Sequence, residues 1–197
     1  MSSWQALGRS ARLLLESLSG VAPAPFLVEW PPACTLCDVV PATLPVLRWL
    51  PDAVSQAPAG PLQELAQHLA AASERCGWRQ TYSPSEVDAS FLQRYGWCEL
   101  VGPSGPISCQ SLRCGFLLLG PQTLYPSHSH QAEELYVPLS GTAEWQQGAG
   151  AFVERDPGAT ILHRSWEPHA TRTVTAPLLA MYLWRGAGLC ERARLRS

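Results

Sequence analysis

The stretch between Tyr125 and Tyr136 carries side chains that can bind a metal ion at evenly spaced positions. Two histidines, His128 and His130, precede Glu134 in this stretch. Because residues two apart point to the same face of an extended chain, His128 and His130 are expected to project together from one strand. Glu134 and Tyr136 are expected to do so from the next extended piece. Imidazole nitrogens and carboxylate oxygens are suitable ligands for a divalent transition metal, so the spacing predicts a metal site.

A third histidine ligand is expected from the region that follows. Four of the five histidines lie between residues 128 and 169, and the two later ones are His163 and His169. Spacing alone does not choose between these two. Three imidazoles and one carboxylate suit one divalent transition metal, either Fe(II), Mn, Zn, Co or Ni, with one or two coordination positions open for substrate.

Composition excludes several other classes of function. A net charge of −2 gives no electrostatic reason to expect DNA, RNA or an anionic membrane as partner. All 14 basic residues are arginines, and the absence of lysine excludes Schiff-base chemistry and a phosphate-binding P-loop. No apolar run reaches the length of a membrane span, so we expect a soluble protein without nucleic-acid or membrane partners.

The cysteines and the amino terminus bear on the cellular compartment. Seven widely spread cysteines, an odd number without a secretory leader, indicate reduced thiols and a cytoplasmic protein. Cys34 and Cys37 form a single C-x-x-C, which we interpret as two packed or surface thiols. The first twenty residues contain Arg9, Arg12 and an apolar run too short for a signal peptide. They fit a transit peptide or an amphipathic helix docked on the body, and we favour the docked helix.

Helical signals are confined mainly to the first part of the chain. Apolar residues recur at helical spacing over 4–19 and 61–76, and a short segment at 44–50 is expected to end at Pro51. We therefore interpret residues 1–77 as a helical extension of three helices, packed on the rest of the protein.

From residue 78 the pattern changes to short apolar runs separated by glycine and proline, with one short helix expected near 86–95. The expected strands are 112–119, 135–139, 143–146, 151–154, 159–162, 170–174 and 178–184. Short strands with regular turns imply a sandwich or barrel that hides its edges. The sequence thus predicts a mostly β domain over residues 78–197 that carries the metal site.

The spacing of the ligands resembles that of the cupin family. The pattern is Gly120…His128-x-His130-x3-Glu134-x6-Gly141, followed by Pro157-x5-His163 and Pro168-His169. The resemblance implies a small β-barrel, or jelly roll, whose first motif supplies two histidines and a glutamate and whose second motif supplies the third histidine. His169 follows Pro168, the form in which cupins usually present that ligand, so the resemblance favours His169 over His163.

The surrounding residues are similar to those of the cupin lyases of dimethylsulfoniopropionate, from about residue 95 to residue 186. The matching stretches are Gly102–Pro106, Gly115–Gly120, Tyr125–Tyr136, Leu139–Trp145, Pro168–Thr173 and Pro177–Gly186. The resemblance implies a metal-dependent carbon–sulfur lyase acting on this small zwitterion. In that family a metal-anchored substrate carboxylate is set beside a tyrosine base, and β-elimination releases dimethyl sulfide and acrylate.

The resemblance also implies roles for four aromatic residues. Tyr136 is the expected base, and Tyr125 is a second base or a positioning hydroxyl. Tyr182 and Trp184 alternate on the last expected strand and so share a face, where their rings are expected to bind the sulfonium group. Packing of all four in the barrel core is the alternative.

Two rival functions stay open. The first is another metal-dependent cupin enzyme, a dioxygenase or isomerase, which need not place Tyr136 beside the metal carboxylate. The second is a cupin that binds a small ligand without catalysis. A homodimer is left open as the assembly.

Overall fold

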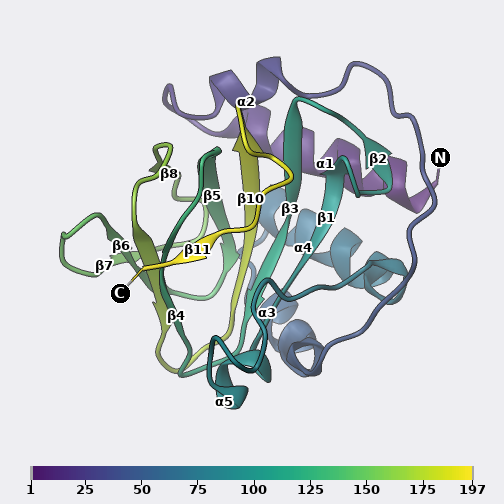
Figure 1. The fold of residues 1–197 in the computed structure, drawn as a ribbon. Helices are drawn as coiled ribbons and strands as arrows, with labels where there is room; N and C mark the ends of the chain where they lie inside the picture. The colour runs from purple at the N-terminus through teal and green to yellow at the C-terminus, as the bar shows by residue number, and fades with distance from the viewer. Residues whose placement is uncertain (1, 197) are drawn as a thin grey trace.

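Two β-sheets face each other in the computed structural model, which describes residues 2–196 (Figure 1). The larger sheet has the strand order β2-β1-β3-β10-β5-β8, and the smaller has the order β11-β4-β9-β6-β7. The strands of the larger sheet are β1 Tyr95–Gly102, β2 Ile107–Ser108, β3 Leu112–Leu119, β5 Glu133–Ser140, β8 Ile161–His163 and β10 Leu178–Arg185. Those of the smaller sheet are β4 Leu124–Ser129, β6 Ala143–Gln147, β7 Val153–Arg155, β9 His169–Thr173 and β11 Arg194–Leu195.

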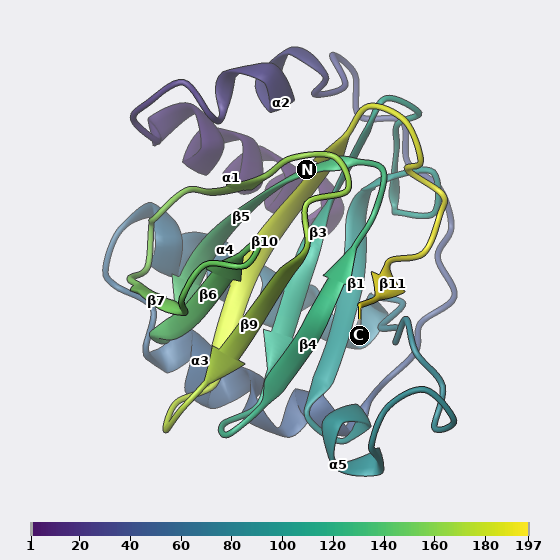
Figure 2. The ribbon, with the colours of Figure 1, turned by 60° about the vertical axis from the view of Figure 1, so that its left-hand side comes forward.

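Most of the helical structure precedes the first strand and covers one face of the larger sheet (Figure 2). The helices, with η marking a 3₁₀ helix, are α1 Ser3–Ser17, α2 Ala24–Val28, η1 Pro45–Trp49, α3 Leu50–Ser55, α4 Pro61–Ala72, η2 Ser73–Arg75 and α5 Ala89–Leu92. Helix α1 begins with a capping box, in which Ser2 and Gln5 satisfy each other's main-chain amides. Helix α4 begins at a proline, whose fixed φ suits the first helical position.

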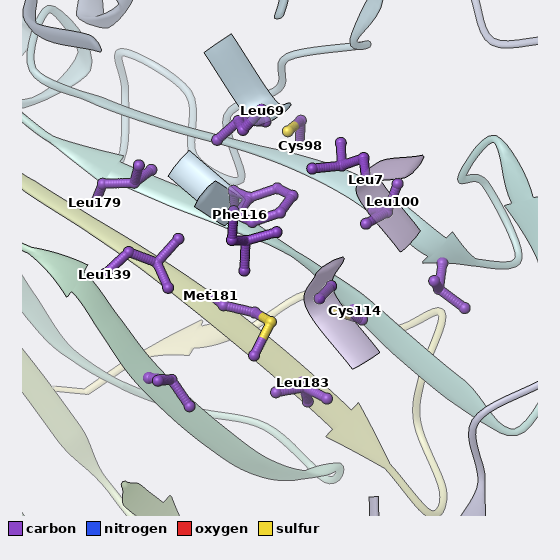
Figure 3. Packing of buried hydrophobic residues seen from close by; sticks show 14 of the residues in the cluster. Leu7, Leu69, Cys98, Leu100, Cys114, Phe116, Leu139, Leu179, Met181 and Leu183 are labelled. Carbon is purple, nitrogen blue, oxygen red and sulfur yellow. The ribbon is translucent and has the colours of Figure 1, made fainter. Parts of the chain in front are cut away.

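The larger sheet is buried on both faces, and its residues alternate between two cores. Along β3, Cys114, Phe116 and Leu118 belong to the core shared with the helices, whereas Leu117 and Leu119 face the smaller sheet. Figure 3 shows the helix-facing core, where side chains of α1 and α4 meet those of β1, β3, β5 and β10. Because both faces are covered, β3 reads as a continuous apolar run.

The predicted mostly β fold with N-terminal helices is confirmed, including strands close to each of the seven expected ranges. Three details of the prediction were wrong. Strand β1 was not expected, although it lies between β2 and β3 in the larger sheet and pairs antiparallel with β3. Pro51 does not end the preceding segment but occupies the first turn of α3, where its missing N–H needs no partner. The part before residue 77 also contains more than three helices.

Two further expectations concern the cysteines and membrane association. Cys34 and Cys37 are exposed, and none of the seven cysteines forms a disulfide within residues 2–196. Among residues 2–196, no helix combines the length and the apolar character needed to cross a membrane.

Candidate metal centre

Strands β4 and β9 bring histidines from two distant segments together. The two strands pair antiparallel, and their register sets His128 opposite His169. One nitrogen from each of His128, His130 and His169 lies within 4.8 Å of the others, and all three side chains are buried. Of the two alternatives for the third histidine, the structure therefore gathers His169 with the first pair and leaves His163 outside this group.

The main chain fixes the orientation of each imidazole in the group. Nδ1 of each ring lies 2.9 Å from a main-chain carbonyl oxygen, and for His128, His130 and His169 these belong to Pro126, Ala132 and Glu167. A carbonyl oxygen can only accept a hydrogen bond, so Nδ1 must carry the proton. In the neutral form of each ring, the lone pair is then on Nε2. This arrangement is typical of metal-binding histidines, whose second nitrogen is held by a hydrogen bond.

Glu134 completes the set from strand β5. Its Oε2 lies 2.9 Å from Nε2 of His130 and 3.2 Å from Nε2 of His169. Burial by itself would raise the pKa of Glu134, but the adjacent His130 and His169 hold it well below its usual range. The carboxylate is therefore ionised although it is fully buried.

The contacts of Glu134 test whether these residues fit a metal ion. Nε2 of His130 and Nε2 of His169 both face the ionised carboxylate at hydrogen-bond distance, so positive charge, either ring protons or a metal ion, is needed between these groups. When two ligand atoms each lie about 2.0–2.2 Å from one shared transition metal, the distance between the two ligand atoms is similar to the distances of Glu134 Oε2 from these two nitrogens. Three imidazoles and one carboxylate therefore fit a divalent transition metal, and this donor set does not select one metal from the series.

His163 lies directly behind the group. Its ring stacks on that of His169, with centroids 4.0 Å apart and planes at 11°, and neither of its ring nitrogens has a hydrogen-bond partner among the described residues. Burial, followed by the charge of neighbouring His169, lowers the pKa of His163 to about 3, so the ring is neutral. Its position supports His169 from behind.

Tyr136 and Tyr125 lie next to different members of the histidine–glutamate group. Tyr136 follows Glu134 by two residues on β5, and both residues line a cavity that is described below. Burial, followed by the charge of Glu134, raises the pKa of Tyr136 well above its usual value. Tyr125 stacks on His128 with centroids 4.1 Å apart, and its hydroxyl lies 3.4 Å from that of Tyr95. Tyr136 is thus next to the ligand carboxylate, and Tyr125 packs on a ligand ring.

A cavity of about 260 Å³ opens beside Glu134 and Tyr136. Tyr182 and Trp184 line it from β10, where they pair with Tyr136 and Glu134 of β5. Trp184 donates a 2.6 Å hydrogen bond from Nε1 to Oε1 of Glu134. The full lining is Gln80, Thr81, Tyr95, Trp97, Arg113, Leu117, Tyr125, Glu134, Tyr136, Tyr182, Trp184, Cys190, Glu191, Arg192 and Ala193.

Several of these lining residues were not predicted from the sequence. Trp97 adds a third aromatic ring 6.3 Å from that of Tyr182, and Arg113 forms an ion pair with the buried Glu99. The alternation of Tyr95 and Trp97 could have indicated an inward-facing strand. Residues 190–193 carry no comparable periodic signal.

Comparisons with known proteins agree on one family. The family model for dimethylsulfoniopropionate lyase matches residues 32–180. Dimethylsulfoniopropionate lyase DddQ of Ruegeria pomeroyi is 33% identical over 162 residues, which cover 81% of this chain and 79% of the relative.

Two solved structures agree over nearly the whole chain. A crystal structure from a study of the DMSP lyases RdDddP and RnDddQII has a TM-score of 0.88 and 35% identity, covering 99% of this chain and 98% of the other. The crystal structure of DMSP lyase DddQ from Ruegeria pomeroyi DSS-3 has a TM-score of 0.88 and 30% identity, covering 98% and 95%.

Proposed function

This chain belongs to the dimethylsulfoniopropionate lyase family, and we propose that it cleaves dimethylsulfoniopropionate by β-elimination to dimethyl sulfide and acrylate. The carbon–sulfur bond breaks after a base removes a proton from the carbon next to the carboxylate. The observation that carries this proposal is Tyr136 on the wall of the cavity, two residues beyond the ionised Glu134.

Tyr136 is the proposed base. Its phenol keeps its proton because burial and the negative charge of Glu134 both raise its pKa. Compensation of the Glu134 charge removes part of this opposition and favours the phenolate. The hydroxyl of Tyr125, held near that of Tyr95, is the proposed positioning group or second base.

The proposed metal ligands are His128, His130, Glu134 and His169. Their convergence and the proton positions on the three rings support this assignment. A divalent metal bound there would act as a Lewis acid that stabilises negative charge on the substrate carboxylate. The chain contributes the fixed orientation of the four ligands and the burial that excludes bulk water from them.

Aromatic faces are the proposed binding site for the sulfonium end of the zwitterion. Tyr182 and Trp184 lie on one face of β10, and Trp97 is in edge contact with Tyr182. A ring face attracts a cation through its quadrupole, by about 0.5–2 kcal/mol per contact. In the proposed pose, the substrate cation lies at these rings, a metal held by Glu134 and the histidines would offset the charge of the substrate carboxylate, and the α-proton faces Tyr136.

Measurement of dimethyl sulfide tests the proposal. Purified protein loaded in turn with Fe(II), Mn, Zn, Co or Ni should release dimethyl sulfide into the headspace when dimethylsulfoniopropionate is added, with acrylate formed in equal amount. Tyr136→Phe should bind the metal normally and lose turnover by about 10²–10⁴-fold, the usual contribution of a general base. Full activity of Tyr136→Phe would exclude the base role, and absence of dimethyl sulfide with every metal would exclude the substrate.

A further inference from the structure

The turn between β8 and β9 is hydrogen-bonded to two of the proposed metal ligands. The main-chain amide of Glu167 donates to the carbonyl oxygen of Arg164 at 2.9 Å and closes this four-residue turn. The carbonyl oxygen of Glu167 accepts the hydrogen bond from Nδ1 of His169, also at 2.9 Å. The main-chain amide of Trp166 donates to the carbonyl oxygen of His130 at 2.7 Å. Two neighbouring residues of one turn thus hold two ligands that come from distant segments.

Trp166 adopts a main-chain conformation that its residue type disfavours. Its φ is 61°, and it occupies the third position of the turn. A turn with positive φ at this position usually carries glycine or asparagine there, because a larger side chain crowds the main chain. The indole is 38% exposed, so burial in a core does not explain its presence. Such strain persists where surrounding contacts fix the residue, and it is concentrated at functional sites.

Two arginines of the C-terminal segment lie over the ring of Trp166. Cζ of Arg194 is 5.2 Å from the ring centroid, and Cζ of Arg196 is 5.9 Å from it. A guanidinium group is attracted to the face of an indole by the quadrupole of the ring. These contacts hold the side chain of Trp166 against the end of the chain.

The same C-terminal segment pairs with the strand that carries the third histidine. Strand β11 lies antiparallel to β4 and sets Leu195 opposite His128 (Figure 1). Nε of Arg196 donates a 2.7 Å hydrogen bond to Oγ of Ser129, the fully buried residue that follows this histidine. The Trp166 ring therefore contacts the segment that is paired with His128, while its turn holds the other two histidines.

We propose that Trp166 is a positioning residue for the metal centre, and this inference rests on the metal site of the proposed function. The two arginines keep the turn in its strained form, which aims the Glu167 carbonyl at Nδ1 of His169 and the Trp166 amide at the main chain of His130. Without the ring, the turn can relax and the imidazole of His169 gains freedom to rotate. Ligands that are fixed before binding lose less conformational entropy when the metal arrives, so they bind it more tightly.

Competition with a chromophoric chelator and the visible absorption of the Co(II)-loaded protein test the inference. Trp166→Gly keeps the main-chain amide and suits positive φ but lacks the ring. It should weaken Co(II) binding about tenfold, the lower end of the effect of groups that orient ligands, and change the intensity of the Co(II) bands, which depends on coordination geometry. Trp166→Phe keeps an aromatic face for the arginines and should recover most of the affinity.

An arginine double variant tests the same role with the turn sequence intact. Arg194→Met combined with Arg196→Met should reproduce the loss of Co(II) affinity and the spectral change. The matched control is Arg48→Met, which removes an exposed guanidinium 3.9 Å from the centroid of Trp49 in the N-terminal helical part of the chain. This control should keep the wild-type affinity and spectrum.

The urea midpoint of the metal-free protein separates positioning from a purely structural role. A lower midpoint of Trp166→Gly combined with wild-type Co(II) affinity and spectrum would overturn the inference. Wild-type affinity in the arginine double variant would overturn it as well. Absence of Co(II) binding by the wild-type protein would instead contradict the metal site of the proposed function.

Discussion

Trp184 contacts two of the proposed metal ligands, Glu134 and His130, in addition to lining the cavity. Its indole Nε1 donates a 2.6 Å hydrogen bond to Oε1 of Glu134, and its ring stacks on that of His130 with centroids 4.0 Å apart. The bond leaves Oε2 of Glu134 facing the two histidines. Trp184 therefore orients one proposed ligand and supports a second, a role that its sequence position on an aromatic strand did not indicate.

Trp184→Phe is expected to weaken metal binding by about 10–100-fold, the usual effect of removing a group that orients a ligand. The phenyl ring keeps the stacking surface on His130 but has no donor for Glu134. Competition with a chromophoric chelator measures the affinity. Tyr182→Phe, on the same strand but without a bond to Glu134, is the matched control and should keep the wild-type affinity. Equal affinity of Trp184→Phe and wild type would restrict Trp184 to lining the cavity.

Elemental analysis of two histidine variants tests the assignment of the third ligand. His169→Ala removes one of the three converging nitrogens and should leave the purified protein with much less than one metal per chain. His163→Phe keeps an aromatic ring stacked behind His169 and should retain close to one metal per chain. The double variant His128→Ala with His130→Ala should bind almost none. Stoichiometric metal in His169→Ala would transfer the role to His163 or refute the site.

The first three proposed ligands could be predicted from the sequence because they lie on two consecutive strands joined by one turn. His128, His130 and Glu134 are close in sequence, so extended geometry alone places them near one another. His169 is different, since its position depends on the register between β4 and β9. Sequence spacing does not encode that register, and the family resemblance was needed to favour it.

The rest of the cavity depends on contacts that leave little trace in the sequence. Strand β1 was missed because Gly96 and Glu99 interrupt its apolar pattern, and Glu99 is buried there as the partner of Arg113 and of the Ser104 amide. The approach of Cys190 to the cavity follows from the pairing of the two-residue strand β11. Such a short strand has no measurable periodicity.

Leu69→Ala tests whether the helices share one core with the sheet. Leu69 of α4 is fully buried in the cluster that also contains Phe116 of β3, so its truncation should lower the free energy of unfolding by about 2–5 kcal/mol. Leu13→Ala on α1, where the side chain is 51% exposed, is the matched control and should change it by no more than about 0.5 kcal/mol. Urea denaturation should give a single transition for both variants. A separate early transition in Leu69→Ala would indicate that the helices unfold alone.

Acid should release the C-terminal segment through Glu86. The main-chain amide of Ser83, followed by the Arg192 guanidinium, holds the pKa of Glu86 at about 2, below its ordinary value of 4.5. Since the folded pKa of Glu86 is depressed, the stabilisation is fully present above pH 4.5 and is lost as the pH falls toward 2.

The difference in urea midpoint between wild type and Glu86→Gln should therefore be constant near neutral pH and shrink below pH 4.5. Arg192 lies on the segment that contains Cys190, so the amide-exchange protection factors of residues 189–196, which correct for the intrinsic pH dependence of exchange, should fall over the same range in the wild type. Because the ion pair is exposed, added salt should reduce both effects, and a pH-independent difference would assign the attachment of the segment to β11 alone.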